Sequence, residues 1–146
     1  MVKIVDDTAF IVIDKSIYNI RKGIHRGLLD VSPMIVRDAR RRITEPPKTG
    51  RLYFRNGSIH QASAPGESPA NLTGDLRDSI YAETTSPYRL QLIADENYAP
   101  HAIWMEFGTE DGRIAPRPFI RPTGKAMARE VVQAIQRGVE RHLGDR

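Results

Sequence analysis

The residue types that most often carry out chemistry are present in this 146-residue sequence, but they are scattered. The histidines are His25, His60, His101 and His142, and none of them has the short spacing that zinc ligands share. The chain has no cysteine, which excludes disulfides, thiolate metal sites and thiol nucleophiles. We therefore predict no metal site, and each histidine is expected to be a hydrogen-bonded or solvent-exposed side chain.

Two pairs of carboxylates could act as general acid and base or hold a divalent cation. They are Asp75 with Asp78 and the adjacent residues 95–96, but no lysine or histidine accompanies either pair at a recognisable spacing. Residues 123–125, Thr-Gly-Lys, resemble the end of a phosphate-binding loop, but Ala126 replaces the hydroxyl residue that would bind magnesium. No serine lies in a nucleophile elbow. The sequence thus predicts a protein that is not an enzyme and needs no cofactor.

The residues that carry most information are in loops. In the segment Glu106-Phe-Gly-Thr109 a glycine directly follows an aromatic residue, which predicts a positive φ at Gly108 and a sharp turn after a packed Phe107. Residues 114–122 hold prolines at positions 116, 118 and 122, and a residue that precedes a proline is held extended. These residues are expected either to form a stiff arm that presents Phe119 and Ile120 or to anchor the core.

Regular elements must position these loops, and the first third of the chain indicates a long helix. Residues 9–13 are apolar and mostly β-branched, which favours a short strand. From Ser16 onward apolar residues recur every three or four positions, as on one face of an amphipathic helix that Pro46-Pro47 would end. Pro33 predicts a kink or a break, with Ser32 as the alternative cap of a second helix. The apolar stripe consists of Ile17, Ile20, Ile24, Leu28, Val31, Ile35, Ala39 and Ile43.

Residues 46–74 are rich in glycine and proline and are predicted to form an extended loop that carries a hairpin. Residues 52–54 and 59–61 flank Asn56-Gly57, and Asn-Gly is a strong signal for a tight hairpin turn. Loops of this length are commonly functional, and we expect this one to be mobile or to become ordered on assembly. Its candidate assembly residues are Lys48, Thr49, Gly50, Pro65, Gly66, Thr73 and Gly74.

The rest of the chain predicts short strands and a terminal helix. Residues 75–80 indicate a helical turn, residues 80–85 and 89–94 indicate two strands, and a helix is expected over residues 122–144. The predicted fold class is α+β, a single domain over residues 1–146. In it a long N-terminal helix and a C-terminal helix pack on one small antiparallel sheet of three to four strands.

The composition favours a soluble globular protein, with 40% hydrophobic and 27% charged residues. The longest apolar run, at residues 9–13, is far shorter than the ~20 residues that span a bilayer, so no membrane association is predicted. The first residues show no basic segment leading into an apolar one. We therefore expect no secretory signal and synthesis inside the cell.

Charge is unevenly distributed along a chain whose formal net charge is +4. Residues 21–55 carry ten basic and three acidic residues, residues 56–112 carry two and nine, and residues 113–146 carry eight and three. Such blocks can steer head-to-tail contact between copies of one chain, or they can be solvated helix faces and loops. An acidic middle is not typical of a nucleic-acid-binding protein, which concentrates basic residues.

Six motifs, in this order, resemble the bacteriophage minor tail-component family, whose members are neck or tail-completion proteins of long-tailed phages and gene-transfer particles. They lie between residues 47 and 125, and the predicted helices on either side fit the layout of that family. The strand-like residues 9–13 and Pro33 depart from it. The motifs are Pro47-Lys-Thr-Gly-Arg-Leu-Tyr53, His60-Gln-Ala-Ser-Ala-Pro-Gly-Glu-Ser-Pro-Ala70, Thr73-Gly-Asp-Leu with Ser79-Ile80, Tyr98-Ala99, Glu106-Phe-Gly-Thr109 and Arg117-Pro-Phe-Ile-Arg-Pro122.

The resemblance implies a structural virion protein, made in the host cytoplasm, that has no enzymatic activity and assembles with itself into a six-fold ring. A head-closure or connector protein would lie on one side of the ring and a tail terminator or tail tube protein on the other. DNA would pass through the lumen without specific binding. The resemblance leaves open whether the chain is the neck ring, a tail terminator or a tail-completion factor.

Aromatic residues and arginines dominate the energetics of protein interfaces, so the motif residues are candidates for subunit contacts. We expect Trp104, Phe107 and Phe119 to anchor these contacts, with Glu106 pairing an arginine. The acidic residues 56–112 would contribute to a lumen that repels DNA. The candidate subunit-interface residues are Trp104, Glu106, Phe107, Gly108, Thr109, Arg117, Phe119 and Arg121.

The alternative function is that of a small basic nucleic-acid-binding protein. Arg37, Arg40, Arg41 and Arg42 form a cluster that could contact phosphates without sequence specificity. The cluster lacks interleaved aromatic residues on which bases could stack. A metal-dependent nuclease is a weaker alternative, because the sequence shows no ligand set.

Overall fold

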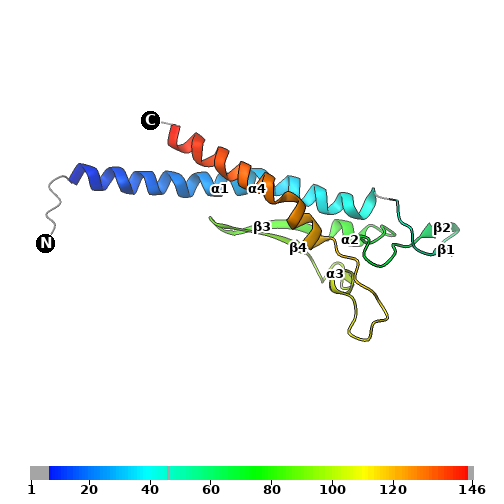
Figure 1. Cartoon of the computed structure of the whole chain (residues 1–146). Helices are drawn as coiled ribbons and strands as arrows, with labels where there is room; N and C mark the ends of the chain where they lie inside the picture. Colours follow the sequence, from blue (N-terminus) through cyan, green and yellow to red (C-terminus); the bar gives the residue numbers. More distant parts are fainter. Residues whose placement is uncertain (1–6, 46, 145–146) are drawn as a thin grey trace. The chain divides into compact units, whose positions relative to one another are not determined.

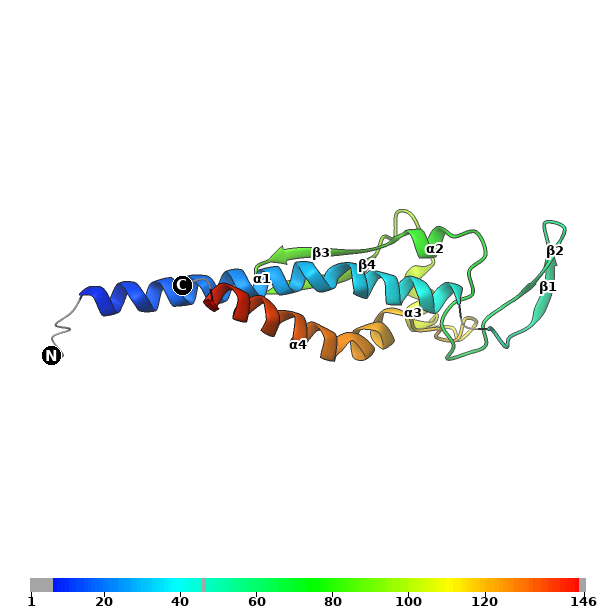
Figure 2. The ribbon, with the colours of Figure 1, turned by 90° about the horizontal axis from the view of Figure 1, so that it is seen from above.

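The computed structural model describes residues 7–45 and 47–144, and these residues form helices and short strands. The predicted α+β class is confirmed. None of the described helices is long and apolar enough to cross a membrane. In chain order the elements are α1 (Asp7–Thr44), β1 (Leu52–Arg55), β2 (Ser58–Gln61), α2 (Asp75–Asp78), β3 (Ile80–Ser86), β4 (Arg89–Ala94), α3 (Ala102–Phe107) and α4 (Ile120–Gly144) (Figures 1 and 2).

The chain divides into two compact units whose segments alternate along the sequence. Of the described residues, the first unit contains 7–31, 84–90 and 129–144, and the second contains 32–45, 47–83 and 91–128. Helices α1 and α4 and the β3–β4 pair each contribute to both units.

Helix α1 is continuous where the sequence predicted two interruptions. The strand predicted at residues 9–13 is wrong, because this segment is helical. β-Branched residues lose only a few tenths of a kcal/mol each in a helix, which the cooperative extension of a helix that is already nucleated offsets. The predicted break at Pro33 and cap at Ser32 are also wrong. The missing N–H of a proline costs a helix about 3 kcal/mol. Because α1 is unbroken at Pro33, Val31 and Ile35 stay four residues apart on one face of the helix, and both side chains are buried.

In the first unit α1 and α4 meet at glycines. A Cβ atom on Gly23 would lie 2.5 Å from Cα of Val139, and one on Gly27 would lie 2.5 Å from the carbonyl oxygen of Ala134. Gly138 of α4 faces the carbonyl oxygen of Gly23 so closely that a Cβ atom there would overlap it. The glycine spacing of α1 therefore permits backbone-to-backbone packing between the two helices within one chain.

The core of the second unit contains apolar side chains from helices, from a strand and from loops. Its buried cluster consists of Ala39 and Ile43 of α1, Leu76 of α2, Ile80 of β3, Ala102 of α3, Ala99 and Phe119. Phe119 is completely buried. The proline-rich segment therefore anchors the core with Phe119, which is the second of the two roles expected for it. The expectation that Phe119 anchors a subunit contact is wrong, because its side chain is not accessible. Ile120 is the first residue of α4, two residues before the predicted start.

The strands form two separate antiparallel pairs, β1 with β2 and β3 with β4, and not one sheet of three to four strands (Figure 1). The register of the first pair runs from Leu52 opposite Gln61 to Arg55 opposite Ser58. The turn uses positive φ angles of 51° at Asn56 and 79° at Gly57, as the Asn-Gly signal predicts. Beyond the strands the pairing continues at Ala62, whose N–H donates to the Arg51 carbonyl oxygen at 3.0 Å and whose carbonyl oxygen accepts from the Gly50 N–H at 2.9 Å. The chain then reaches the proline-rich segment, where the Gly66 N–H donates to the Pro116 carbonyl oxygen at 2.9 Å.

Candidate functional site

Glu106 occupies a buried position at the end of α3 and holds the beginning of α4. Its carboxylate accepts hydrogen bonds from the backbone N–H groups of Phe119 at 2.7 Å, Ile120 at 2.9 Å and Arg121 at 3.1 Å. The Nε atom of Arg121 donates to the same carboxylate at 2.9 Å, and its Nη2 atom donates to the Glu106 carbonyl oxygen at 3.0 Å. The expected pairing of Glu106 with an arginine is thus made inside the chain, with Arg121.

The surroundings of Glu106 favour its ionised form. Burial alone would raise the pKa of this carboxyl, but the N–H groups of Phe119, Ile120 and Arg121 and the Arg121 guanidinium lower it below its ordinary value. The first N–H groups of a helix have no partner within the helix and carry partial positive charge, so an anion there is stabilising. Glu106 is therefore a structural anchor between α3 and α4.

Helix α3 carries an exposed apolar surface, which we call the α3 patch and which consists of Ile103, Trp104 and Phe107. The exposed fractions of these residues are 54%, 49% and 61%. The Arg121 guanidinium lies 5.0 Å from the centroid of the Phe107 ring, a cation–π contact. Phe107 is therefore not packed in the core as the sequence predicted, whereas Trp104 and Phe107 are both accessible as interface candidates.

A tight loop follows the α3 patch. Gly108 has a φ of 78°, as predicted, and the carbonyl oxygen of Ile114 lies 2.8 Å from the place where its Cβ would be. The N–H of Thr109 donates to that same oxygen at 3.0 Å, and the Thr109 hydroxyl donates to Asp111 at 2.6 Å. A hollow of about 780 Å³ lies beside the patch and is lined by Ile103, Trp104, Phe107, Gly108, Thr109, Glu110 and Asp111.

The β1–β2 hairpin carries a second exposed apolar surface, the hairpin face, which consists of Leu52, Phe54 and Ile59. Phe54 stands opposite Ile59, and side chains two residues apart on a strand share a face, so the three residues lie together. Their exposed fractions are 61%, 74% and 72%. The sequence predicts the hairpin, but the residues of this face and Ile103 were not among the predicted interface residues. The apolar alternation of residues 52, 54 and 59 about the turn was the available signal.

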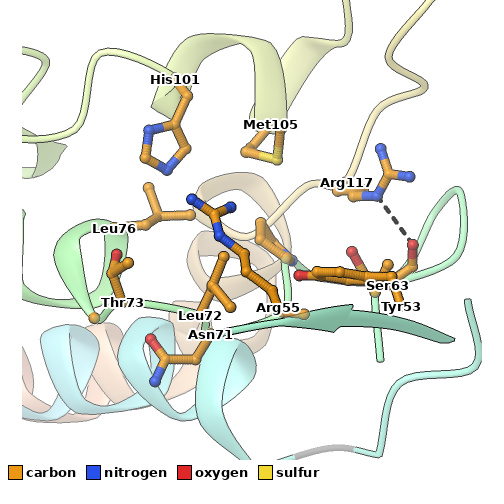
Figure 3. Close-up of a pocket in the computed structure, with 14 residues that line it drawn as sticks. Tyr53, Arg55, Ser63, Asn71, Leu72, Thr73, Leu76, His101, Met105 and Arg117 are labelled. Atoms are coloured by element: carbon orange, nitrogen blue, oxygen red, sulfur yellow. Dashed lines mark hydrogen bonds between the residues drawn. The ribbon is translucent and has the colours of Figure 1, made fainter. Parts of the chain in front are cut away.

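The opposite face of the hairpin borders a pocket of about 450 Å³ (Figure 3). Tyr53 and Arg55 line it from β1, Met105 from α3 and His101 from the position just before α3, and Arg117 lines it from the loop before α4. The Arg55 guanidinium points into the pocket toward His101, and no described residue pairs with it (Figure 3). The lining contains two guanidinium groups, those of Arg55 and Arg117, and no carboxylate, so the pocket could bind an anionic group such as a carboxylate.

The predicted assembly loop has a defined path that Glu67 and the proline-rich segment hold. The carboxylate of Glu67 accepts hydrogen bonds from the Thr49 hydroxyl at 2.5 Å and from the Ala64 N–H at 2.8 Å. The hydrogen bond from Thr49 is the largest of several contacts that lower the pKa of Glu67. The N–H of Gly66 donates to the carbonyl oxygen of Pro116 at 2.9 Å, and Arg117 Nε donates to that of Ser63 at 3.2 Å.

The remaining loop candidates make local contacts. Lys48 Nζ donates to the Arg42 carbonyl oxygen at 2.9 Å and so caps the end of α1. Gly50 pairs with the Ala62 carbonyl oxygen at 2.9 Å, and Pro65 is exposed. The Thr73 hydroxyl donates to Asp75, and Gly74 precedes α2 with a φ of 97°. These contacts give the loop structure, and its ordering on assembly stays a prediction.

The arginine cluster at the end of α1 is largely engaged within the chain. Arg40 Nη2 donates to the Ile80 carbonyl oxygen at 2.8 Å. Asp38 accepts from Arg42 Nε at 2.7 Å and from Arg41 Nη2 at 3.2 Å. Burial would raise the pKa of Asp38, but the hydrogen bonds from Arg42 and Arg41 lower it. Of the cluster, only Arg37 makes no ion pair or side-chain hydrogen bond with the described residues.

Within the described part of the chain, no group of three or more histidine, aspartate or glutamate side chains could hold a metal ion. The carboxylates of the two predicted pairs serve local contacts: Asp78 pairs with Arg77 at 2.6 Å, and Asp95 accepts from the Asn97 N–H at 2.9 Å. Comparison of the chain with protein-family models, curated proteins and solved structures gave no significant match.

Proposed function

We propose that this chain is a structural protein of a phage particle that assembles with itself into a ring at the neck or the tail-proximal end. The observation that carries the proposal is the pair of exposed apolar surfaces, the hairpin face and the α3 patch, on hydrogen-bonded elements of the second unit. Large apolar side chains that cluster on a surface mark interaction sites. The motif resemblance supplies the setting, a ring between the head connector and the tail tube.

The charge distribution supports contact between different surfaces of identical chains. Opposite charge blocks, seven net positive over residues 21–55 and seven net negative over residues 56–112, can orient one copy against the next. In a closed ring each subunit uses one surface toward one neighbour and another surface toward the other neighbour. A ring of this kind needs no reaction centre and no cofactor.

The test is the native mass by light scattering at low salt and at about 0.5 M salt, a concentration that screens exposed charges within a few ångströms. We expect a closed oligomer whose mass falls or whose dissociation increases in high salt. Electron microscopy of the low-salt sample should show rings with a central opening. Open filaments, or a monomer that also fails to bind phage head connectors, would contradict the proposal.

A further inference from the structure

The hairpin face is unpartnered in the chain that carries it. Leu52, Phe54 and Ile59 all have more than half of their surface exposed, and Phe54 at 74% is the most exposed of them. An isolated two-stranded hairpin is only marginally stable in water, so one that exposes a complete apolar face gains most from a partner that covers it. The hairpin face therefore needs an apolar counterpart.

The same chain carries a counterpart of matching character. The α3 patch exposes Ile103, Trp104 and Phe107 beside the hollow of about 780 Å³. Aromatic residues at the edge of a concave surface are the usual anchors of interface energy. The Trp104 ring, 49% exposed, is available to pack against aliphatic and aromatic side chains from outside.

Each surface is bordered by a charged side chain that is unpaired among the described residues, and the two are opposite in sign. Residues 47–66, which contain the hairpin, include the basic residues Lys48, Arg51 and Arg55 and no aspartate or glutamate. The lining of the hollow beside the α3 patch includes Glu110 and Asp111. Arg113 pairs with Asp111 at 3.1 Å, and Arg121 lies over Phe107 and pairs with Glu106, so among the described residues Glu110 is the carboxylate that is left without a partner there. Glu110 has no ion-pair partner among the described residues, and neither has Arg51. Opposite charges around complementary apolar centres select a partner and fix its orientation.

We propose that the hairpin face of one copy docks on the α3 patch of the next copy, with Arg51 near Glu110. The inference rests on the self-assembly in the proposed function and assigns the surfaces that carry it. Because the two surfaces differ, each copy keeps one free hairpin face and one free α3 patch until the assembly closes. The contact is therefore head-to-tail, which leads to a ring when the rotation between neighbours closes.

The experiment uses two exposed-residue variants of the full chain, Phe54→Ser in the hairpin face and Trp104→Ser in the α3 patch. Sedimentation velocity measures the mass of each variant. We expect each substitution to weaken self-association about tenfold or more, as truncation of an interface anchor does. Tyr88→Ser is the matched control, because Tyr88 is 55% exposed and lies outside both surfaces. It should assemble like the unchanged chain, and circular dichroism should show all three variants folded.

Mixing the two variants tests the head-to-tail arrangement directly. The Phe54→Ser chain keeps its α3 patch and the Trp104→Ser chain keeps its hairpin face, so a one-to-one mixture should form heterodimers and nothing larger. A charge exchange is the second measurement: Arg51→Glu should weaken assembly, and Glu110→Lys in the same chain should restore it.

The outcomes separate the two proposals. If the unchanged chain forms rings but Phe54→Ser and Trp104→Ser form them equally well, this assignment of surfaces is wrong while the proposed function stands. If mixed variants fail to form a heterodimer, the head-to-tail pairing of these surfaces is also wrong. An unchanged chain that stays monomeric at its highest soluble concentration overturns the pairing, and binding to head connectors then decides the proposed function.

Discussion

Glu106 acts on α4 as an N-cap side chain does, although it belongs to another helix 14 residues earlier than Ile120. One carboxylate satisfies three backbone N–H groups that α4 itself cannot satisfy and also pairs with Arg121. The substitution of Glu106 should act on folding first, and assembly should suffer because the α3 patch lies on the same helix as Glu106.

Glu106→Ala should lower the free energy of unfolding by about 2 kcal/mol or more, because it leaves buried backbone donors without an acceptor. Urea unfolding followed by circular dichroism measures this loss. The matched control is Glu96→Ala, because Glu96 is exposed and makes no hydrogen bond or ion pair with the described residues. It should change stability by no more than about 0.5 kcal/mol. If the two substitutions have equal effects, the anchoring role of Glu106 is wrong.

The pH dependence of the same site has a definite sign. The pKa of Glu106 is lower in the folded chain than in the unfolded chain, so its ionised form stabilises the fold above the ordinary glutamate range near pH 4. That contribution is lost as the pH falls through the lowered pKa. The stability difference between the unchanged chain and Glu106→Gln should therefore shrink between pH 7 and about pH 3. A difference that is constant over this range would mean that the charge contributes nothing.

The crossing of α1 and α4 in the first unit depends on the absence of side chains at three glycines. Gly138→Ala would place a methyl group against the Gly23 carbonyl oxygen and 3.0 Å from the Gly27 nitrogen. We expect it to destabilise the fold by about 1–3 kcal/mol, the usual cost of overpacking. Gly124→Ala in the same helix is the control, because nothing lies within 4 Å of its Cβ position. It should stabilise the chain by up to about 1 kcal/mol. Thermal unfolding of both variants checks the opposite signs.

The elements that local sequence determines were predictable, and those that depend on distant partners were not. The Asn56-Gly57 turn and the hairpin strands follow from neighbouring residues. The helical state of residues 9–13 does not, because β-branched residues favour a strand only weakly and an existing helix overrides them. The path of the loop after β2 also depends on distant residues, such as Pro116, whose carbonyl oxygen accepts from the Gly66 N–H, and spacing alone does not show this contact or the separation of the strands into two pairs.

The sequence likewise predicted the local features of the candidate site but not its contacts with distant residues. The prediction of a turn with a positive φ at the glycine of Glu106-Phe-Gly-Thr109 is confirmed, and an arginine partner for Glu106 was expected. Its donors at residues 119–121 lie far along the chain, so the sequence could not show that the contact is internal. For the same reason the burial of Phe119 and the exposure of Phe107 became clear only in the folded chain.

The net charge of +4 and the isoelectric point near 9.6 would suit a nucleic-acid-binding protein. The cluster that would contact phosphates is, however, partly neutralised from within. Asp38 pairs with Arg41 and Arg42, and Arg40 donates to the Ile80 carbonyl oxygen. Binding of DNA through this cluster would require it to give up those contacts, so passage of DNA without tight association is the expected behaviour.

We therefore expect no retardation of duplex DNA by the unchanged chain at physiological salt in a gel-shift titration. Asp38→Asn removes the carboxylate charge that pairs with Arg41 and Arg42, so this variant should bind DNA more tightly, with an affinity that falls steeply as salt rises. Glu45→Gln is the control: it changes net charge equally, but Glu45 meets Arg41 only at 3.9 Å on the exposed surface. Its effect should be smaller than that of Asp38→Asn. Tight, salt-dependent binding by the unchanged chain that Arg37→Glu abolishes would instead favour the nucleic-acid-binding function over the ring.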